Sequence, residues 1–94
     1  MARKRTRIDI IGDMLASIAN KGGKIKPTHL MYNSNLSHTQ MSSYLDDLIE
    51  KQLVQKVERN KYEYIGITDK GYEFMNKLKE MKEFERAFGL ADEN

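Results

Sequence analysis

The sequence has 94 residues with no cysteine, a single proline and no long hydrophobic run. Without cysteine the chain has no disulfide, no thiolate metal ligand and no nucleophilic thiol. No apolar stretch is long enough to span a bilayer, and the basic first residues lead into an amphipathic segment. We therefore expect a cytoplasmic protein without a membrane partner.

A strong excess of one charge is also lacking. The 16 Lys and Arg side chains nearly balance the 14 Asp and Glu side chains, which leaves a net charge of +2. A net charge of this size is weak support for a nucleic-acid partner. The basic side chains are nevertheless concentrated near the N-terminus, at Arg3, Lys4, Arg5 and Arg7. This arm is a candidate phosphate contact, although basic termini are equally often solvating tails.

The residue types that catalysis requires are not arranged for it. We find no nucleophile next to a base, no paired carboxylates and no phosphate-binding glycine loop. His29 and His38 lie on different predicted elements, with no carboxylate at metal-ligand spacing. We expect no enzymatic activity, no metal and no cofactor.

Three helices are predicted in the first half of the chain, joined by short breaks. Apolar residues recur at helical spacing over 7–20, and Gly22 and Gly23 end that helix. A second helix is predicted over 27–33, because the only proline suits its first turn. The polar residues of 33–35 favour a tight turn before the third helix.

The start of the third helix is the most fully specified signal. Ser37 and Gln40 have the spacing of a capping box, and Leu36 and Met41 occupy the two hydrophobic-staple positions. An apolar stripe follows at helical spacing, and it comprises Met41, Tyr44, Leu45, Leu48 and Ile49. The opposite face of the first two turns is small and uncharged, with His38, Thr39, Ser42 and Ser43.

A β-hairpin with a basic tip is predicted after these helices. Two short runs rich in β-branched and aromatic residues, 53–58 and 62–67, are joined by Arg59, Asn60 and Lys61. A charged tip alone is common in soluble hairpins. Beside a helix-turn-helix it becomes a candidate phosphate contact.

The last predicted helix runs from Asp69 to about Phe88 and would be roughly 30 Å long at 1.5 Å per residue. That length exceeds what a compact domain of this size covers. We expect the side chains from Leu78 onward to lie beyond the reach of the core and to need a second copy of the chain. The predicted dimerisation residues are Phe74, Leu78, Met81, Phe84 and Phe88.

The order of elements predicts a mainly α fold with a small β-hairpin. The runs THLMYNSNLS at 28–37, YLDDL at 44–48 and YIGITDKG at 64–71 resemble archaeal winged helix-turn-helix DNA-binding proteins, especially the ten-kilodalton chromatin-associated class. The resemblance implies an antiparallel coiled coil of two C-terminal helices, with the recognition helix and the wing facing DNA. One departure is Gln52, where members of that class usually have glycine.

Three segments follow from this interpretation, a basic arm over 1–6, a winged helix-turn-helix over 7–70 and a dimerisation helix with its tail over 71–94. Asp46, Asp47 and Glu50 would repel phosphate, so only the first two turns of the third helix can approach DNA. The predicted DNA contacts are Arg3, Lys4, Arg5, Arg7, Ser37, His38, Thr39, Gln40, Ser42, Ser43, Arg59, Asn60 and Lys61.

The expected function is binding of double-stranded DNA by a nucleoid-associated homodimer, as a transcriptional regulator or an architectural chromatin protein. Two alternatives remain open at this point, because fold does not determine function. One is a protein-interaction adaptor that keeps the winged fold. The other is an RNA- or ribosome-associated protein that uses the same basic surfaces.

Overall fold

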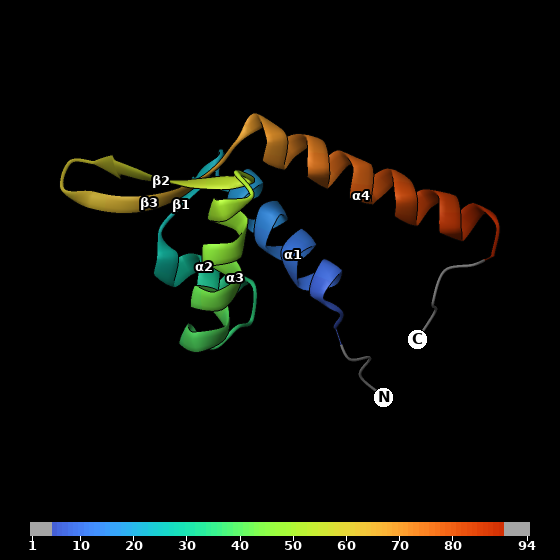
Figure 1. Ribbon diagram of the computed structural model, residues 1–94, viewed down its shortest axis with the longest axis horizontal. Coiled ribbons are helices and arrows are strands. Elements are labelled where there is room, and N and C mark those ends of the chain that lie inside the picture. Colours follow the sequence, from blue (N-terminus) through green and yellow to red (C-terminus); the bar gives the residue numbers. More distant parts are fainter. Residues whose placement is uncertain (1–4, 90–94) are drawn as a thin grey trace.

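The computed structural model describes residues 5–89, in which four helices accompany a small antiparallel sheet whose β2–β3 hairpin projects from one end (Figure 1). The strand order is β1-β3-β2, with both neighbouring pairs antiparallel. This arrangement confirms the predicted mainly α fold with a hairpin. The elements are α1 (Arg7–Asn20), β1 (Lys24–Ile25), α2 (Pro27–Asn33), α3 (His38–Glu50), β2 (Val54–Arg59), β3 (Tyr62–Ile67) and α4 (Asp69–Ala87).

One hydrophobic core joins the helices to one face of the sheet. On α3 the predicted stripe is confirmed, since Met41, Leu45 and Leu48 are buried. On α1 the first apolar residue, Ile8, is 38% exposed, so the buried stripe begins one turn later. The fully buried apolar side chains are Met14, Leu15, Ile18, Leu30, Leu48, Val54 and Ile65.

Both α1 and α3 begin with a capping box. The Thr6 hydroxyl accepts from the backbone N–H of Asp9, and the Asp9 carboxylate accepts from the backbone N–H of Thr6, each at 3.1 Å. At α3 the Ser37 hydroxyl accepts from Gln40 N at 3.1 Å, and Gln40 Oε1 accepts from Ser37 N at 2.9 Å. Each box satisfies backbone donors that the helix start leaves unpaired.

The exit from α3 requires a left-handed residue, and Gln52 supplies it with φ of 63°. A non-glycine residue in this conformation carries a steric cost, which nearby hydrogen bonds offset. The Thr68 hydroxyl lies 2.7 Å from Gln52 O and 3.0 Å from Leu53 O, and it also caps α4 by accepting from Gly71 N. The end of α3 and the start of α4 are therefore tied together.

The first half of α4 packs on α1. Leu78 is only 9% exposed, and a Cβ added to Gly12 would lie 2.8 Å from Leu78 Cδ2. The expectation that Leu78 lies beyond the core is therefore wrong, because the absent side chain at Gly12 lets the two helices approach. Phe74 is half-buried and also packs against the core. Beyond this contact α4 extends away from the body of the fold (Figure 1).

Candidate nucleic-acid interface

The first two turns of α3 present a small polar surface. His38, Thr39, Ser42 and Ser43 are exposed, while Met41 anchors the opposite side of the helix in the core. The backbone N–H groups of a helix start carry partial positive charge, which favours an anion nearby. This end of α3 can therefore approach a phosphate or a base edge closely without a long side chain intervening.

The side chains of Ser37 and Gln40 serve the helix itself. Both are exposed, and their oxygens accept the two capping hydrogen bonds described above. Their main contribution to the surface is to hold the start of α3 in one conformation.

Two cations compensate the charge of Asp47 on the second half of α3. Its carboxylate forms ion pairs with Lys51 and with Arg7 from α1. The hydrogen bond from Lys51, supplemented by the charge of Arg7, lowers the pKa of Asp47. The Arg7 guanidinium also lies 5.3 Å from the centre of the Tyr44 ring. Arg7, predicted as a DNA contact, is thus engaged with α3.

The remaining carboxylates of this helix make its second half acidic, as the sequence predicts. Asp46 and Glu50 are exposed and form no ion pair with any residue from 5 to 89. The surface of α3 therefore changes from uncharged at its start to acidic at its end. Repulsion of a polyanion is therefore weakest at the start of the helix.

Arg5 is used inside the fold, in contrast to its predicted place on a free arm. Its guanidinium donates to Ser34 O at 2.8 Å and to Asn35 O at 2.9 Å, at the turn between α2 and α3. Asp13 of α1 holds the guanidinium from the other side at 3.0 Å. The other two predicted arm contacts, Arg3 and Lys4, lie outside the described residues.

The hairpin turn consists of two residues in the left-handed region, Asn60 with φ of 53° and Lys61 with φ of 69°. Two such residues are typical of the type I′ turn, whose twist matches that of the flanking strands. Arg59 and Tyr62 form the last cross-strand pair before the turn. Arg59, Asn60 and Lys61 are all exposed, so two cations lie at the tip.

The hairpin and α3 project from the end of the molecule opposite the free end of α4 (Figure 1). Over residues 5–89, no group of three or more His, Asp or Glu side chains is placed to hold a metal ion. No helix within that range is long and apolar enough to cross a lipid bilayer.

Comparison with known families agrees with this geometry. The family model for the winged helix-turn-helix matches residues 4–86. The chain belongs to this family. The β2–β3 hairpin is its wing, and α3 occupies the position of the recognition helix.

Solved structures with the same winged-helix fold include archaeal and viral proteins. Sso10a-2, a DNA-binding protein from Sulfolobus solfataricus, has a TM-score of 0.76 at 20% identity, covering 89% of this chain and 85% of that one. F93 from STIV, a winged-helix DNA-binding protein, has a TM-score of 0.70 at 19% identity, covering 87% and 92%. The resemblance found in the sequence is confirmed by these matches.

A bacterial regulator shares the fold as well. MepR, a transcription regulator of the Staphylococcus aureus multidrug efflux pump MepA, has a TM-score of 0.72 at 18% identity, covering 90% of this chain and 66% of that one. No curated protein sequence matches the chain. At these identities the likeness establishes the winged-helix fold.

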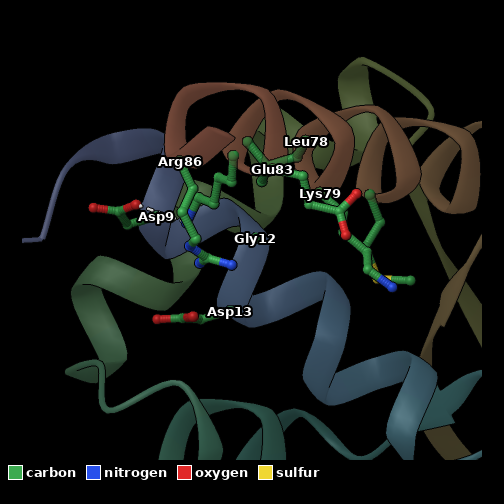
Figure 2. Close-up of a pocket in the computed structure, with 9 residues that line it drawn as sticks. Asp9, Gly12, Asp13, Leu78, Lys79, Glu83 and Arg86 are labelled. Atoms are coloured by element: carbon green, nitrogen blue, oxygen red, sulfur yellow. Dashed lines mark hydrogen bonds and ion pairs between the residues drawn. The ribbon is translucent and has the colours of Figure 1, made fainter. Parts of the chain in front are cut away.

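A groove of about 360 Å³ lies between α1 and α4 of this winged helix. Figure 2 shows Asp9 and Asp13 on one side and side chains of α4, including Lys79 and Arg86, on the other. Lys82 Nζ lies 3.3 Å from Asp9 Oδ1 and so links the two walls. Cations and carboxylates are mixed along the groove, which gives it no preference for a ligand of one charge.

The sequence pattern does not single out Lys26 and Tyr62 of the winged domain. Lys26 Nζ lies 5.2 Å from the centre of the Tyr62 ring, and that ring is 60% exposed. The residues are far apart in the chain and meet because β1 pairs with β3. Period-2 alternation along the strand would have placed Tyr62 on the face away from the core, but nothing local pairs it with Lys26.

Proposed function

We propose that this winged helix-turn-helix protein binds double-stranded DNA through the start of α3 and the tip of the wing. The observation that carries the proposal is the exposed, uncharged face of the first two turns of α3, which a capping box holds in place. In this fold the recognition helix enters the major groove by its N-terminal residues. The description of Sso10a-2 and of F93 as DNA-binding proteins supports the same reading.

The polar side chains at the start of α3 divide into two roles in this proposal. His38, Thr39, Ser42 and Ser43 face the DNA, where hydroxyl groups accept or donate hydrogen bonds to base edges or phosphates. Ser37 and Gln40 hold the helix start. Asp46 and Glu50 repel phosphate and so limit the contact to the first two turns.

The basic wing tip supplies phosphate contacts that do not depend on sequence. Replacing Arg59 by Gln and Lys61 by Asn removes both charges, and Asn tolerates the left-handed backbone at position 61. Binding should weaken on every duplex, and the slope of log affinity against log salt should fall by roughly one to two units. An unchanged slope would remove the wing from the interface.

The decisive experiment for α3 is a pair of charge changes. Thr39→Glu with Ser42→Glu adds two negative charges on the proposed DNA face and leaves the core untouched, so duplex binding should be lost while thermal stability is retained. Lys70→Glu changes the net charge equally at an exposed position on α4 and should bind nearly as well as the wild type. Equal binding by both variants would favour a protein-interaction adaptor.

We also propose that the protein acts as a homodimer. Met81, Phe84 and Phe88 on the free half of α4 are 46%, 59% and 67% exposed. The rings of Phe84 and Phe88 lie 4.9 Å apart, and Met81 precedes Phe84 by three positions, the spacing of side chains on one helix face. A row of large apolar side chains on a single helix is typical of a surface that a second copy covers.

A dimer presents two recognition helices to one DNA molecule or to two. Competition among random and selected duplexes separates the two roles that remain, since a regulator prefers particular sequences and an architectural chromatin protein binds nearly all of them. We expect the protein to be associated with the nucleoid in either role. A preference for structured RNA over every duplex would contradict both.

A further inference from the structure

The two faces of the wing differ in charge. Antiparallel partners share a face, and successive residues alternate between faces. Glu58 and Glu63 are direct partners and lie on the face whose base, at Ile65 and Ile67, is buried in the core. The strand residues of the opposite face, the outer face, include no carboxylate.

The outer face combines cations with tyrosines. Arg59 is the partner of Tyr62, and Val57 is the partner of Tyr64. A Cβ built on Gly66 would lie 3.1 Å from Val57 Cγ2 and 3.7 Å from Lys24 Cγ, so Lys24 of β1 extends the same face. The outer face includes Lys24, Lys26, Val57, Arg59, Tyr62 and Tyr64.

Tyr62 is the most accessible aromatic group on this face, with 60% of its surface exposed. Lys26 Nζ lies over the ring, 5.2 Å from its centre, which places a positive charge at one face of the ring. Tyr64 and Val57 are half-buried beside it, and Gly66 beyond them has no side chain. The result is a flat surface, with an exposed ring near one end and cations from β1 and β2 along both sides.

Exposed aromatic rings on a basic sheet surface fit unpaired bases. Every base has a π-face that can stack on tyrosine, while its phosphates need neutralising charges at the edges of the sheet. Duplex DNA offers phosphates but keeps its bases stacked inside the helix. Its phosphates would contact the cations, and no base would stack on Tyr62. The ring next to the lysines therefore selects single strands.

We propose that the outer face of the sheet is a second nucleic-acid site that binds single-stranded DNA, with Tyr62 as the stacking platform and Lys24, Lys26 and Arg59 as phosphate contacts. The choice of DNA over RNA rests on the proposed function, because a duplex held by α3 places unpaired DNA beside the wing whenever that duplex opens. The site itself is separate from α3.

The test measures binding of fluorescein-labelled (dU)12 by anisotropy, with a labelled duplex measured in parallel. Stacking on one aromatic side chain predicts a loss of about tenfold in (dU)12 affinity for Tyr62→Ala and almost none for Tyr62→Phe. Duplex affinity and the melting temperature should remain unchanged. Tyr32→Ala is the matched control, since that tyrosine is 75% exposed and belongs to α2 rather than to the sheet.

The lysines are tested separately from the ring. Lys24→Gln with Lys26→Gln should weaken (dU)12 binding and lower the salt slope by roughly one unit, since each single-strand phosphate contributes about 0.7. Photocrosslinking of (dU)12 that carries 5-iodo-2′-deoxyuridine should label Tyr62 rather than Tyr32. This readout does not depend on the stability of any variant.

Three results would overturn the proposal. The first is that Tyr62→Ala binds (dU)12 with full affinity. The second is that the oligonucleotide crosslinks to residues outside the outer face. The third is that (rU)12 binds more tightly than (dU)12, which would reject DNA as the occupant. The two proposals fail separately. If the Thr39→Glu, Ser42→Glu variant keeps duplex binding, α3 is not the duplex site. Binding of (dU)12 that depends on Tyr62 would still show that the outer face binds single-stranded DNA.

Discussion

Arg5 and Ser34 are joined by a hydrogen bond of 2.8 Å from the guanidinium to the main-chain carbonyl at the end of α2. The last carbonyls of a helix have no partner within the helix and carry partial negative charge, so a cation there is favourable. The bond connects the segment before α1 to the turn that leads into α3. The orientation of the proposed recognition helix therefore depends on a residue outside the helix-turn-helix.

We expect Arg5→Ala to destabilise the fold by about 1 to 2 kcal/mol, because it removes charge-assisted hydrogen bonds to two carbonyl groups. Arg5→Lys should recover only part of this, since an ammonium cannot reproduce the planar fork. Urea unfolding measures both. Arg59→Ala, which replaces an exposed arginine on the wing, is the control. If it lowers the free energy of unfolding as much as Arg5→Ala does, the hydrogen bonds from Arg5 to the turn do not account for the loss.

Gly71 is expected to tolerate no side chain. A Cβ there would lie 2.2 Å from Leu53 O, a backbone atom that cannot move without displacing β2 from α4. Gly71→Ala should cost at least about 2 kcal/mol through overpacking. At Gly22 an added Cβ has no atom within 4 Å, so the only penalty of Gly22→Ala is the left-handed backbone. Gly22→Ala should therefore lower the stability less than Gly71→Ala in the same thermal unfolding experiment. Equal losses would contradict the close approach.

Acid should weaken the start of α1. The backbone N–H of Thr6 and, to a smaller extent, Lys82 lower the pKa of Asp9 from 3.8 to about 2. Because the pKa is lower in the folded state than in the unfolded chain, the contribution of this carboxylate is present above about pH 4. It is lost as the pH falls toward 2.

Asp9→Asn is the variant that tests this titration, because the amide oxygen keeps a cap acceptor but does not ionise. Its melting temperature should be lower than that of the wild type at pH 6, and the difference should shrink between pH 4 and pH 2. Asp46→Asn, at an exposed position on α3, is the control. A difference independent of pH would show that the charge of Asp9 is irrelevant.

The dimer is expected to depend on the free half of α4. Met81→Glu with Phe84→Glu should give a monomer in sedimentation equilibrium, because each apolar side chain buried in the interface contributes about 1.5 to 3 kcal/mol. Asn76→Glu with Ala87→Glu adds the same charge at other exposed positions of α4 and should remain dimeric. A wild-type chain that is monomeric at micromolar concentration would reject the dimer and leave the apolar surface without an occupant.

Local signals in the sequence were sufficient for the order and the ends of most elements. The capping box at Ser37 and Gln40, the proline at the start of α2 and the basic hairpin tip each involve residues within four positions of one another. Such interactions form with little loop-closure cost, so the same residues adopt them in any compatible fold. The predicted helix-turn-helix and wing followed from these signals together with the resemblance.

Contacts between distant residues came only from the tertiary structure. Arg5 and Ser34 are 29 positions apart, and whether the guanidinium is free or bonded depends on how the arm meets the turn. Leu78 was assigned to a dimer surface because the length of α4 was known but its direction was not, and packing on Gly12 placed the side chain in the core. The cation beside Tyr62 likewise requires β1 to pair with β3.

What the sequence determines and what the tertiary structure decides differ in the sequence separation of the interacting residues. Backbone hydrogen bonds and steric preferences act over one turn of helix or one hairpin, so the residue pattern alone determined the positions of α1 to α4 and of the wing. The burial of Leu78, the engagement of Arg5 and Arg7 and the two unlike faces of the sheet depend on which surfaces meet. Burial of apolar area between elements that are distant in the sequence drives that choice, and only the assembled tertiary structure decides it.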